Sequence, residues 1–148
     1  MRSVPHQQIA AVAAEAPASL LVTWKDGTGE RVDLSTLIAK GRYLAPLQDP
    51  AVFRAAQVGE WGWSVEWPNG IDLSSHQLWR WAGEQKGDFM PADDFRAWME
   101  RNGMSLSKAA DALGLSRRMV AYYASGERPV PKTVRLATLG FDVERRAA

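Results

Sequence analysis

The most regular pattern of apolar and polar positions lies in residues 105–126, where apolar residues recur at helical spacing on both sides of a glycine. Ser105 is expected to begin a first helix, with its hydroxyl accepting a hydrogen bond from the backbone N–H of Lys108. Gly114 suits the left-handed residue that ends such a helix. Ser116 then begins a second helix after a short break. The pattern therefore predicts two short helices joined by a tight turn.

The second of these helices is expected to end at Gly126 and to have two different faces. Its inward positions are Val120, Tyr123 and Ala124. Its outward positions carry two cations, small residues and a tyrosine, and they are Arg117, Arg118, Ala121, Tyr122 and Ser125. Arginines bind guanine edges and phosphates, and free N–H groups at a helix N-terminus favour a phosphate. This is the arrangement of a helix-turn-helix, whose second helix lies in the DNA major groove; a plain helical hairpin is the alternative.

The flanking sequence predicts further short helices. Residues 91–102 begin with a proline and two acidic residues, which are favourable in the first turn of a helix, and their apolar positions are Phe95, Trp98 and Met99. Pro131 suits the first position of a last helix. Val134, Ala137 and Thr138 are expected to face one way along that helix. Residues 91–148 are therefore expected to form an all-α domain of four or five short helices.

Positive charge gathers around the second helix of the pair. The whole chain is nearly neutral, with 18 basic and 17 acidic residues. Residues 101–135 hold two acidic residues, Asp111 and Glu127, against the basic residues Arg101, Lys108, Arg117, Arg118, Arg128, Lys132 and Arg135. Such a patch is typical of a surface that binds nucleic acid. Because the patch is small, we expect a homodimer on two half-sites about 34 Å apart.

The run from Leu106 to Tyr123, with residues 125–131 after it, resembles the helix-turn-helix domains of the lambda-repressor and Cro type, also called the xenobiotic-response-element type. The resemblance implies that the DNA-binding residues are Ser116, Arg117, Arg118, Ala121, Tyr122, Arg128 and Lys132. The chain departs from the family at two positions. Leu106 stands where a glutamine often contacts a phosphate, and Ala124 stands where a glutamate is frequent. The resemblance therefore implies the architecture but not the DNA sequence that is bound.

The first part of the chain has the alternating pattern of strands. Leu20, Val22 and Trp24 alternate with other residues before a hairpin signal at residues 26–27, so we expect a strand there and a return strand over residues 30–34. Residues 8–14 are a weaker candidate for a strand ahead of them. Residues 34–38 are expected to form a short helix. Residues 53–58 and 63–67 are expected to pair as a second hairpin, with Trp63, Val65 and Trp67 on one face.

Asp72 and Ser74 are expected to cap a helix that carries Leu78, Trp79 and Trp81. The resulting order is β-β-β-α-β-β-α, which makes the predicted fold class α+β: a small Trp-rich domain over residues 1–82, a linker over residues 83–90, and the helical domain over residues 91–148. Six of the seven tryptophans lie in residues 1–82. Most are expected to fill the core of this small domain. Trp61 and one of Trp79 and Trp81 are expected to be exposed.

Residues 20–27, 32–38, 47–53 and 65–74 are similar to the bacterial domain-of-unknown-function family 2442, most specifically from Trp67 to Leu73. The resemblance covers residues 5–82 and implies a fold without a reaction. Some members carry a C-terminal helix-turn-helix, and some are encoded beside small proteins regarded as toxins. The resemblance therefore implies an antitoxin-like role and a toxin-like protein partner.

The chemistry of the chain favours binding over catalysis. It has no cysteine, which excludes disulfides and thiolate metal sites. His76 lies near Asp72, Ser74 and Ser75, but these are local neighbours at a helix start, whereas a catalytic triad assembles from distant segments. We therefore expect no enzyme activity, no cofactor and no metal. Residues 1–17 lack the pattern of a secretory signal, and no stretch is apolar enough for a membrane span, so we expect a cytoplasmic protein.

Three functions fit these observations. The first is a sequence-specific, duplex-DNA-binding transcriptional regulator that acts as an autoregulating antitoxin, with the N-terminal domain binding a partner or mediating dimerisation. The second is a protein-interaction adaptor whose helical domain no longer binds DNA. The third is a regulator controlled by a small molecule that binds a Trp-lined pocket in the N-terminal domain. Salt-sensitive DNA binding separates the first from the second.

Overall fold

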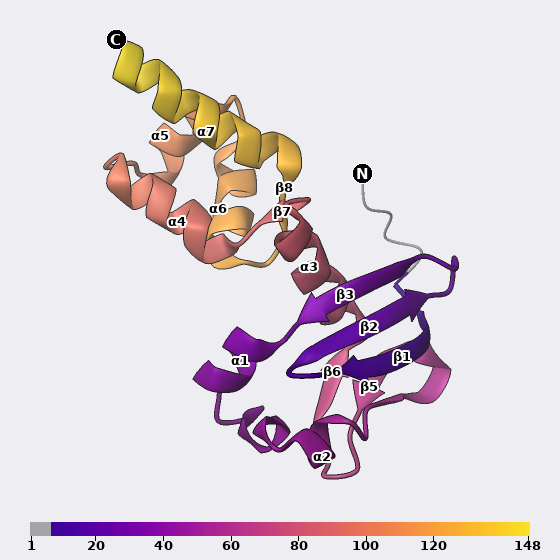
Figure 1. Cartoon of the computed structure of the whole chain (residues 1–148). Helices are drawn as coiled ribbons and strands as arrows, with labels where there is room; N and C mark the ends of the chain where they lie inside the picture. Colours follow the sequence, from indigo (N-terminus) through magenta and orange to yellow (C-terminus); the bar gives the residue numbers. More distant parts are fainter. Residues whose placement is uncertain (1–6) are drawn as a thin grey trace. The chain divides into compact units, whose positions relative to one another are not determined.

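The protein is a mixed α and β chain that divides into two compact units, Met1–Gln85 (unit 1) and Lys86–Ala148 (unit 2). The computed structural model describes residues 7–148, and Figure 1 shows its elements. Each unit has its own core of buried apolar side chains.

The first part of unit 1 is an antiparallel sheet with the strand order β1-β2-β3 (Figure 1). Its strands are β1 (Ile9–Glu15), β2 (Ser19–Trp24) and β3 (Gly29–Asp33), and α1 (Ser35–Lys40) follows them. The alternation seen in the sequence sets the inner face, because Leu20, Val22 and Trp24 are all buried. The indole of Trp24 donates to Glu30 Oε1 at 2.7 Å, which satisfies its one polar atom inside the core. The predicted three strands and short helix are therefore confirmed.

The second part of unit 1 differs from the prediction. A second antiparallel sheet has the order β4-β5-β6. Its elements, with the short helices before and within it, are η2 (Ala45–Gln48), α2 (Pro50–Phe53), β4 (Gln57–Val58), η3 (Glu60–Gly62), β5 (Ser64–Glu66) and β6 (Asp72–Ser74). The strand expected over residues 53–58 is wrong for most of its length. Asp49 accepts a hydrogen bond from the backbone N–H of Ala51 at 2.9 Å, and Pro50 suits a first turn, so the chain is helical up to Phe53.

The helix α3 (Ser75–Lys86) begins as expected at one of its two proposed caps. The hydroxyl of Ser74 accepts from the backbone N–H of Gln77 at 3.1 Å, whereas Asp72 lies in β6, a strand that the sequence did not predict. The division between the units falls inside the linker expected over residues 83–90, but most of this segment is structured: α3 continues to Lys86, and Phe89–Met90 forms the strand β7, which pairs with β8 (Val130–Pro131). Local sequence patterns do not predict this pair, because its two strands are far apart in the sequence.

The tryptophans of unit 1 fall into two groups. Trp24, Trp67 and Trp79 are buried, and Trp81 is half-buried. Trp61 is 75% exposed, as expected, but Trp63 is 53% exposed and does not share the inner face of β5. The reason is that Trp63 follows η3 with helical backbone angles, φ −89° and ψ −1°, and β5 begins only at Ser64. The loop before it lies close to β1, since a Cβ on Gly62 would lie 2.4 Å from the carbonyl oxygen of Ile9.

Unit 2 consists of four helices and the short β7-β8 pair (Figure 1). The helices are α4 (Ala92–Arg101), α5 (Leu106–Leu113), α6 (Arg117–Ser125) and α7 (Lys132–Ala147). Residues from all of them form one core, which consists of Phe95, Trp98, Met99, Ala109, Ala110, Val120, Tyr123, Val130 and Val134. Ala109 and Ala110 leave room for the neighbouring helix, and α5 contacts both α6 and α7.

The caps of α5 and α6 are those that the sequence predicts. Ser105 Oγ accepts from the backbone N–H of Lys108 at 3.2 Å, and Ser116 Oγ accepts from that of Met119 at 3.1 Å. Gly114 ends α5 at φ 70° and Gly126 ends α6 at φ 82°, both in the left-handed region. The predicted pair of short helices joined by a tight turn is therefore confirmed.

The last helix, α7, differs from the sequence prediction in one detail. Val134 and Thr138 are buried as expected, but Ala137 is exposed. The inner side of α7 continues instead through Phe141, which packs against the core of unit 2. Spacings of four and three residues keep Val134, Thr138 and Phe141 on one side, and Ala137 lies to the side of this line.

Candidate functional site

The exposed side of α6 carries a cluster of two arginines around one tyrosine. Arg118 Nε donates to the hydroxyl of Tyr122 at 2.8 Å, and its Cζ lies 5.5 Å from the centre of the Tyr122 ring. The Cζ of Arg128 lies 4.4 Å from the centre of the same ring. Both distances are within the range of a cation–π contact. We call Arg118, Tyr122 and Arg128 the arginine–tyrosine cluster.

The local sequence explains how this cluster forms. Arg118 and Tyr122 are four residues apart on α6 and therefore lie one above the other on its surface. After the left-handed turn at Gly126, the chain returns beside α6, and the backbone N–H of Arg128 donates to the carbonyl of Tyr122 at 3.3 Å. Ser125 supports the turn, since its hydroxyl donates to the Tyr122 carbonyl at 3.1 Å and accepts from the Glu127 N–H at 3.2 Å.

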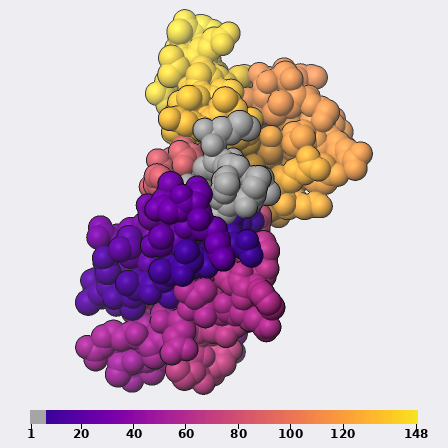
Figure 2. Space-filling model, turned by 90° about the vertical axis from the view of Figure 1, so that its right-hand side faces the viewer, coloured from indigo at the N-terminus to yellow at the C-terminus, as the bar shows by residue number. Residues whose placement is uncertain are grey.

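The remaining sequence-predicted site residues are not all part of this cluster. Ser116 and Arg117 are exposed at the start of α6, and Lys132 is exposed at the start of α7. Ala121 is half-buried. Figure 2 shows the orange surface that includes α5 and α6 on one face of the molecule. Contacts bring together Arg118, Tyr122 and Arg128, whereas no contact joins Arg117 or Lys132 to them within residues 7–148.

The arginines on this surface are not neutralised by carboxylates. Within the described part of the chain, Arg117, Arg118 and Arg128 form no ion pair. The two contacts of Arg118 and Arg128 with the Tyr122 ring order their guanidinium groups but leave the positive charges in place. The sequence pattern indicates each of these residues separately and does not predict that they contact one another. The signal that could have found the first contact is the spacing of four residues between Arg118 and Tyr122.

The two departures from the helix-turn-helix pattern have clear structural positions. Leu106 is partly buried against the core of unit 2, so its side chain stabilises α5 and offers no hydrogen bond to a phosphate. Ala124 is half-buried, and its carbonyl accepts a hydrogen bond from Arg96, which also pairs with Asp93 in the first turn of α4. The side chain of Arg96 on α4 thus contacts the end of α6 through the backbone carbonyl of Ala124.

A buried tyrosine lies beside the cluster. The ring of Tyr123 meets that of Phe95 edge to face, with 5.8 Å between their centres. Burial raises the pKa of the Tyr123 hydroxyl, and the positive charge of Arg128 opposes this shift in part. Tyr123 is therefore neutral at physiological pH, and it holds α6 to the core rather than taking part in proton transfer.

A polar network joins α4 to α7 on another part of unit 2. Asp142 accepts hydrogen bonds from Trp98 Nε1 at 3.1 Å, Asn102 Nδ2 at 3.1 Å and Arg101 Nη2 at 3.2 Å. Burial by itself would raise the pKa of Asp142. The hydrogen bonds from Asn102, Arg101 and Trp98 and the charge of Arg101 outweigh burial and lower the pKa below its usual value. The network thus favours the ionised carboxylate and fixes the helices on which α5 and α6 pack.

The residues around His76 in unit 1 do not converge on one another. His76 Nδ1 lies 3.1 Å from Gln7 Oε1, and its ring stacks on Trp79 with 5.8 Å between centres. Asp72 Oδ1 instead accepts from the Tyr43 hydroxyl at 3.1 Å, and Ser74 caps α3. Among the described residues, no group of three or more His, Cys, Asp or Glu side chains is placed to hold a metal ion.

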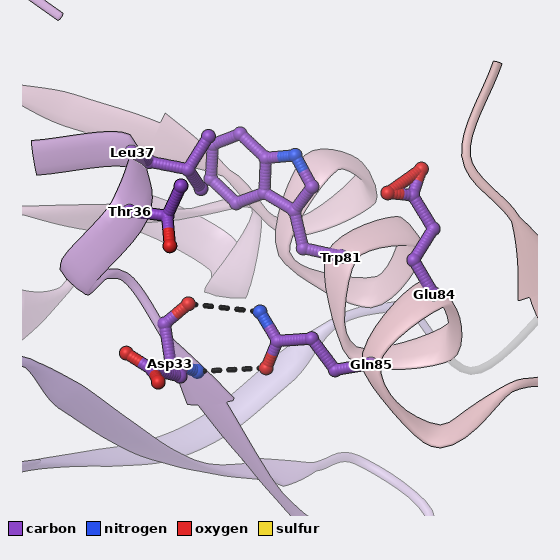
Figure 3. Close-up of a pocket in the computed structure, with 6 residues that line it drawn as sticks. All are labelled: Asp33, Thr36, Leu37, Trp81, Glu84 and Gln85. Atoms are coloured by element: carbon purple, nitrogen blue, oxygen red, sulfur yellow. Dashed lines mark hydrogen bonds between the residues drawn. The ribbon is translucent and has the colours of Figure 1, made fainter. Parts of the chain in front are cut away.

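Unit 1 also has a pocket of about 410 Å³ beside the half-buried Trp81 (Figure 3). Its lining residues are Asp33, Thr36, Leu37, Trp81, Glu84 and Gln85. Gln85 closes one side by donating to the Asp33 carbonyl and accepting from the Asp33 N–H, each at 2.8 Å. Trp81 is the one tryptophan among these lining residues.

The comparisons with known proteins fit this division into two units. The family described as "Protein of unknown function (DUF2442)" matches residues 9–84, about half of the chain. The chain belongs to this family. The DUF2442 match thus covers nearly all the described part of unit 1, and the predicted resemblance of the N-terminal domain is confirmed.

One similar solved structure extends over both units. It is a crystal structure of a protein from Nitrosomonas europaea described as a "Putative DNA Binding Protein", with 40% sequence identity and a TM-score of 0.54. The similarity covers 93% of this DUF2442 chain and 88% of the other chain. Among curated proteins, none matches. Within residues 7–148, no helix combines the length and apolar character that crossing a lipid bilayer requires.

Proposed function

We propose that α5 and α6 form a helix-turn-helix of the lambda-repressor and Cro type, and that the protein is a sequence-specific, duplex-DNA-binding transcriptional regulator. The single observation that carries this proposal is the set of unneutralised arginines on the exposed side and start of α6. Arg118 and Arg128 are held in place by the Tyr122 ring, and Arg117 is exposed beside the capping residue Ser116. The similarity to a structure that is itself described as that of a DNA-binding protein supports the proposal.

The proposed role of each residue follows from its position. Ser116 and Arg117 lie at the start of α6, where free backbone N–H groups favour a phosphate. Ala121 is small enough to let α6 approach the floor of the major groove. Arg118, in the same first turn, and Tyr122, one turn further along α6, contact bases or backbone. Arg128 and Lys132 lie after α6 and contact flanking phosphates.

The test is binding of the full-length protein to the duplex upstream of its own gene. We expect Arg117→Ala/Arg118→Ala to weaken binding and to flatten the plot of log affinity against log salt by about 0.9 for each phosphate contact that is lost. The matched control is Lys25→Ala/Lys40→Ala, which removes the same charge from exposed positions in unit 1. If the double arginine variant binds as tightly as the parent, α6 is not the DNA-reading helix.

A protein-interaction adaptor is the second candidate, and the packing of Leu106 favours it. Its side chain lies against the core where a hydrogen bond to a phosphate would be useful. An adaptor would bind a partner protein but show no salt-sensitive affinity for any duplex. Selection of bound fragments from random duplex DNA decides between the two candidates, because a regulator enriches a sequence and an adaptor does not.

An autoregulating antitoxin is a narrower form of the first proposal. It requires binding to DNA upstream of the protein's own gene and a neutralising contact between unit 1 and a toxin-like protein encoded beside it. Co-expression with that neighbour is the test, because an antitoxin restores growth and a regulator without this role does not. In all of these proposals the protein acts by binding, without enzyme activity or a cofactor, in the cytoplasm.

A further inference from the structure

The helix α7 is apolar on two opposite sides. Val134 and Thr138 are buried on the inner side. Three large apolar side chains lie on the other side, where Leu136 is 49% exposed, Leu139 51% and Val143 63%. A helix at the surface of a single unit normally has a polar outer face. We call Leu136, Leu139, Gly140 and Val143 the outer stripe; Figure 1 shows α7, in yellow, at the edge of unit 2.

Gly140 has no explanation within its own unit. A Cβ built on it would meet no atom within 4 Å, and its φ is not in the left-handed region. Glycine is among the least favourable residues in the interior of a helix. Its usual benefit is to let another backbone approach closely. In the outer stripe it lies beside Leu139, at the centre of the exposed apolar side chains.

The charged residues near the middle of α7 do not interrupt the stripe. Arg135 Nε donates to the Gly87 carbonyl at 3.2 Å, and Asp142 accepts from Trp98 and Arg101 of α4 and from Asn102, which follows that helix. Both side chains are therefore directed toward their own unit. What remains on the outer side is an apolar strip about two turns long, from Leu136 to Val143.

The stripe is complementary to itself. Leu136 and Val143 are equally spaced on either side of the midpoint between Leu139 and Gly140. An identical helix laid antiparallel across this midpoint brings Leu136 against Val143 of the second copy, and the reverse contact forms by symmetry. This is the property of an isologous twofold interface. We propose that the outer stripe is the interface at which a second copy of this chain docks.

The size of the stripe sets the strength of the dimer. A strip of this kind covers a few hundred Å², whereas a stable interface buries about 800 Å² on each partner. The isolated protein is therefore a weak dimer. Two copies held on neighbouring half-sites of one duplex meet at a high effective concentration, so the same contact adds cooperativity. This last step alone rests on the proposed DNA-binding function.

The test is sedimentation equilibrium of the full-length protein from about 10 µM to 1 mM, the range of weak association. We expect the parent to associate with concentration and Gly140→Gln to weaken association by about tenfold or more. Glutamine favours helix and has open space at this position in its own chain, so the variant is expected to fold. The control is Ala137→Gln, which places the same side chain on an exposed position of α7 outside the stripe.

The same variants on DNA separate this inference from the proposed function. A parent that is monomeric at all concentrations, or a Gly140→Gln variant that dimerises as the parent does, overturns the dimer interface even if DNA binding is intact. Association that requires Gly140, without binding to any duplex, supports the interface and overturns the proposed function. When both hold, Gly140→Gln binds a single half-site normally but loses cooperativity on two half-sites.

Discussion

At the scale of single residues, the polar network around Asp142 is the feature of unit 2 that responds most directly to pH. Its carboxylate accepts three hydrogen bonds from α4 and from Asn102, which follows that helix, and they hold its pKa below the ordinary value of 3.8. A carboxylate with a lowered pKa stabilises the fold above its unfolded pKa. This stabilisation is lost as the pH falls through the lower pKa of the folded state.

We therefore expect Asp142→Asn to lower the free energy of unfolding of unit 2 by about 1–3 kcal/mol at pH 7, because an amide cannot accept all three hydrogen bonds. The difference from the parent should shrink at an acidic pH below this lowered pKa, where the parent's carboxyl is protonated too. Urea unfolding followed by circular dichroism at both pH values measures it. Asp111→Asn, an exposed change on α5, is the control; a deficit that is the same at both pH values contradicts the assigned role of charge.

Trp61 shows a residue-scale effect that the sequence predicted only in part. Its exposure follows from its place in a loop, but its left-handed backbone, with φ 61°, does not. A non-glycine residue in this region is strained and persists only where its surroundings fix it. Here Gln8 Nε2 donates to the Trp61 carbonyl at 2.9 Å, and Glu60 accepts from the Trp61 indole at 2.9 Å. The first of these contacts comes from the residue just before β1, 53 positions away in the sequence.

At the scale of elements, the start of α6 depends on one hydroxyl. Ser116 satisfies the free backbone N–H of Met119, and among residues 7–148 no other side chain caps this end. The proposed DNA-reading residues follow directly after it, so fraying of this turn would also disorder Arg117 and Arg118. Local stability and the geometry of the candidate site are therefore coupled.

We expect Ser116→Ala to destabilise unit 2 by about 1 kcal/mol, the usual effect of losing an N-cap. Thermal unfolding followed by circular dichroism measures this loss. Ser107→Ala is the matched control, because Ser107 lies exposed within α5 and alanine is the better helix former there. Equal stability of Ser116→Ala and the parent would show that water replaces the cap without cost.

At the scale of the whole molecule, the division between the units falls after Gln85, inside the predicted linker over residues 83–90, but that segment is largely structured. Residues 87–90 of the predicted linker contribute to unit 2. They do so through the β7-β8 pair, the buried side chain of Phe89 and the hydrogen bond from Arg135 to the Gly87 carbonyl. These contacts join residues 40 or more positions apart, so they are absent from any local pattern.

We therefore expect a fragment of residues 86–148 to unfold cooperatively and a fragment of residues 91–148 to be less stable by at least about 2 kcal/mol, since it lacks the burial of Phe89 and one strand of the pair. Thermal and urea unfolding of the two fragments measure this difference. Phe89→Ala in the longer fragment tests the cause, and this variant should lose most of the stability that separates the two fragments. Equal stability of the two fragments would show that the folded part of unit 2 begins at residue 91.

The sequence by itself determined the elements whose causes are local. Serine hydroxyls and left-handed glycines fix the ends of α5 and α6, and strict alternation fixes the inner face of β2. The candidate site residues Arg117 and Arg118 follow from the same local spacing. Only the tertiary structure decided where Arg128 returns to the Tyr122 ring, where β7 pairs and which tryptophans are exposed. Each of these depends on contacts between distant segments, which loop closure and core packing determine together.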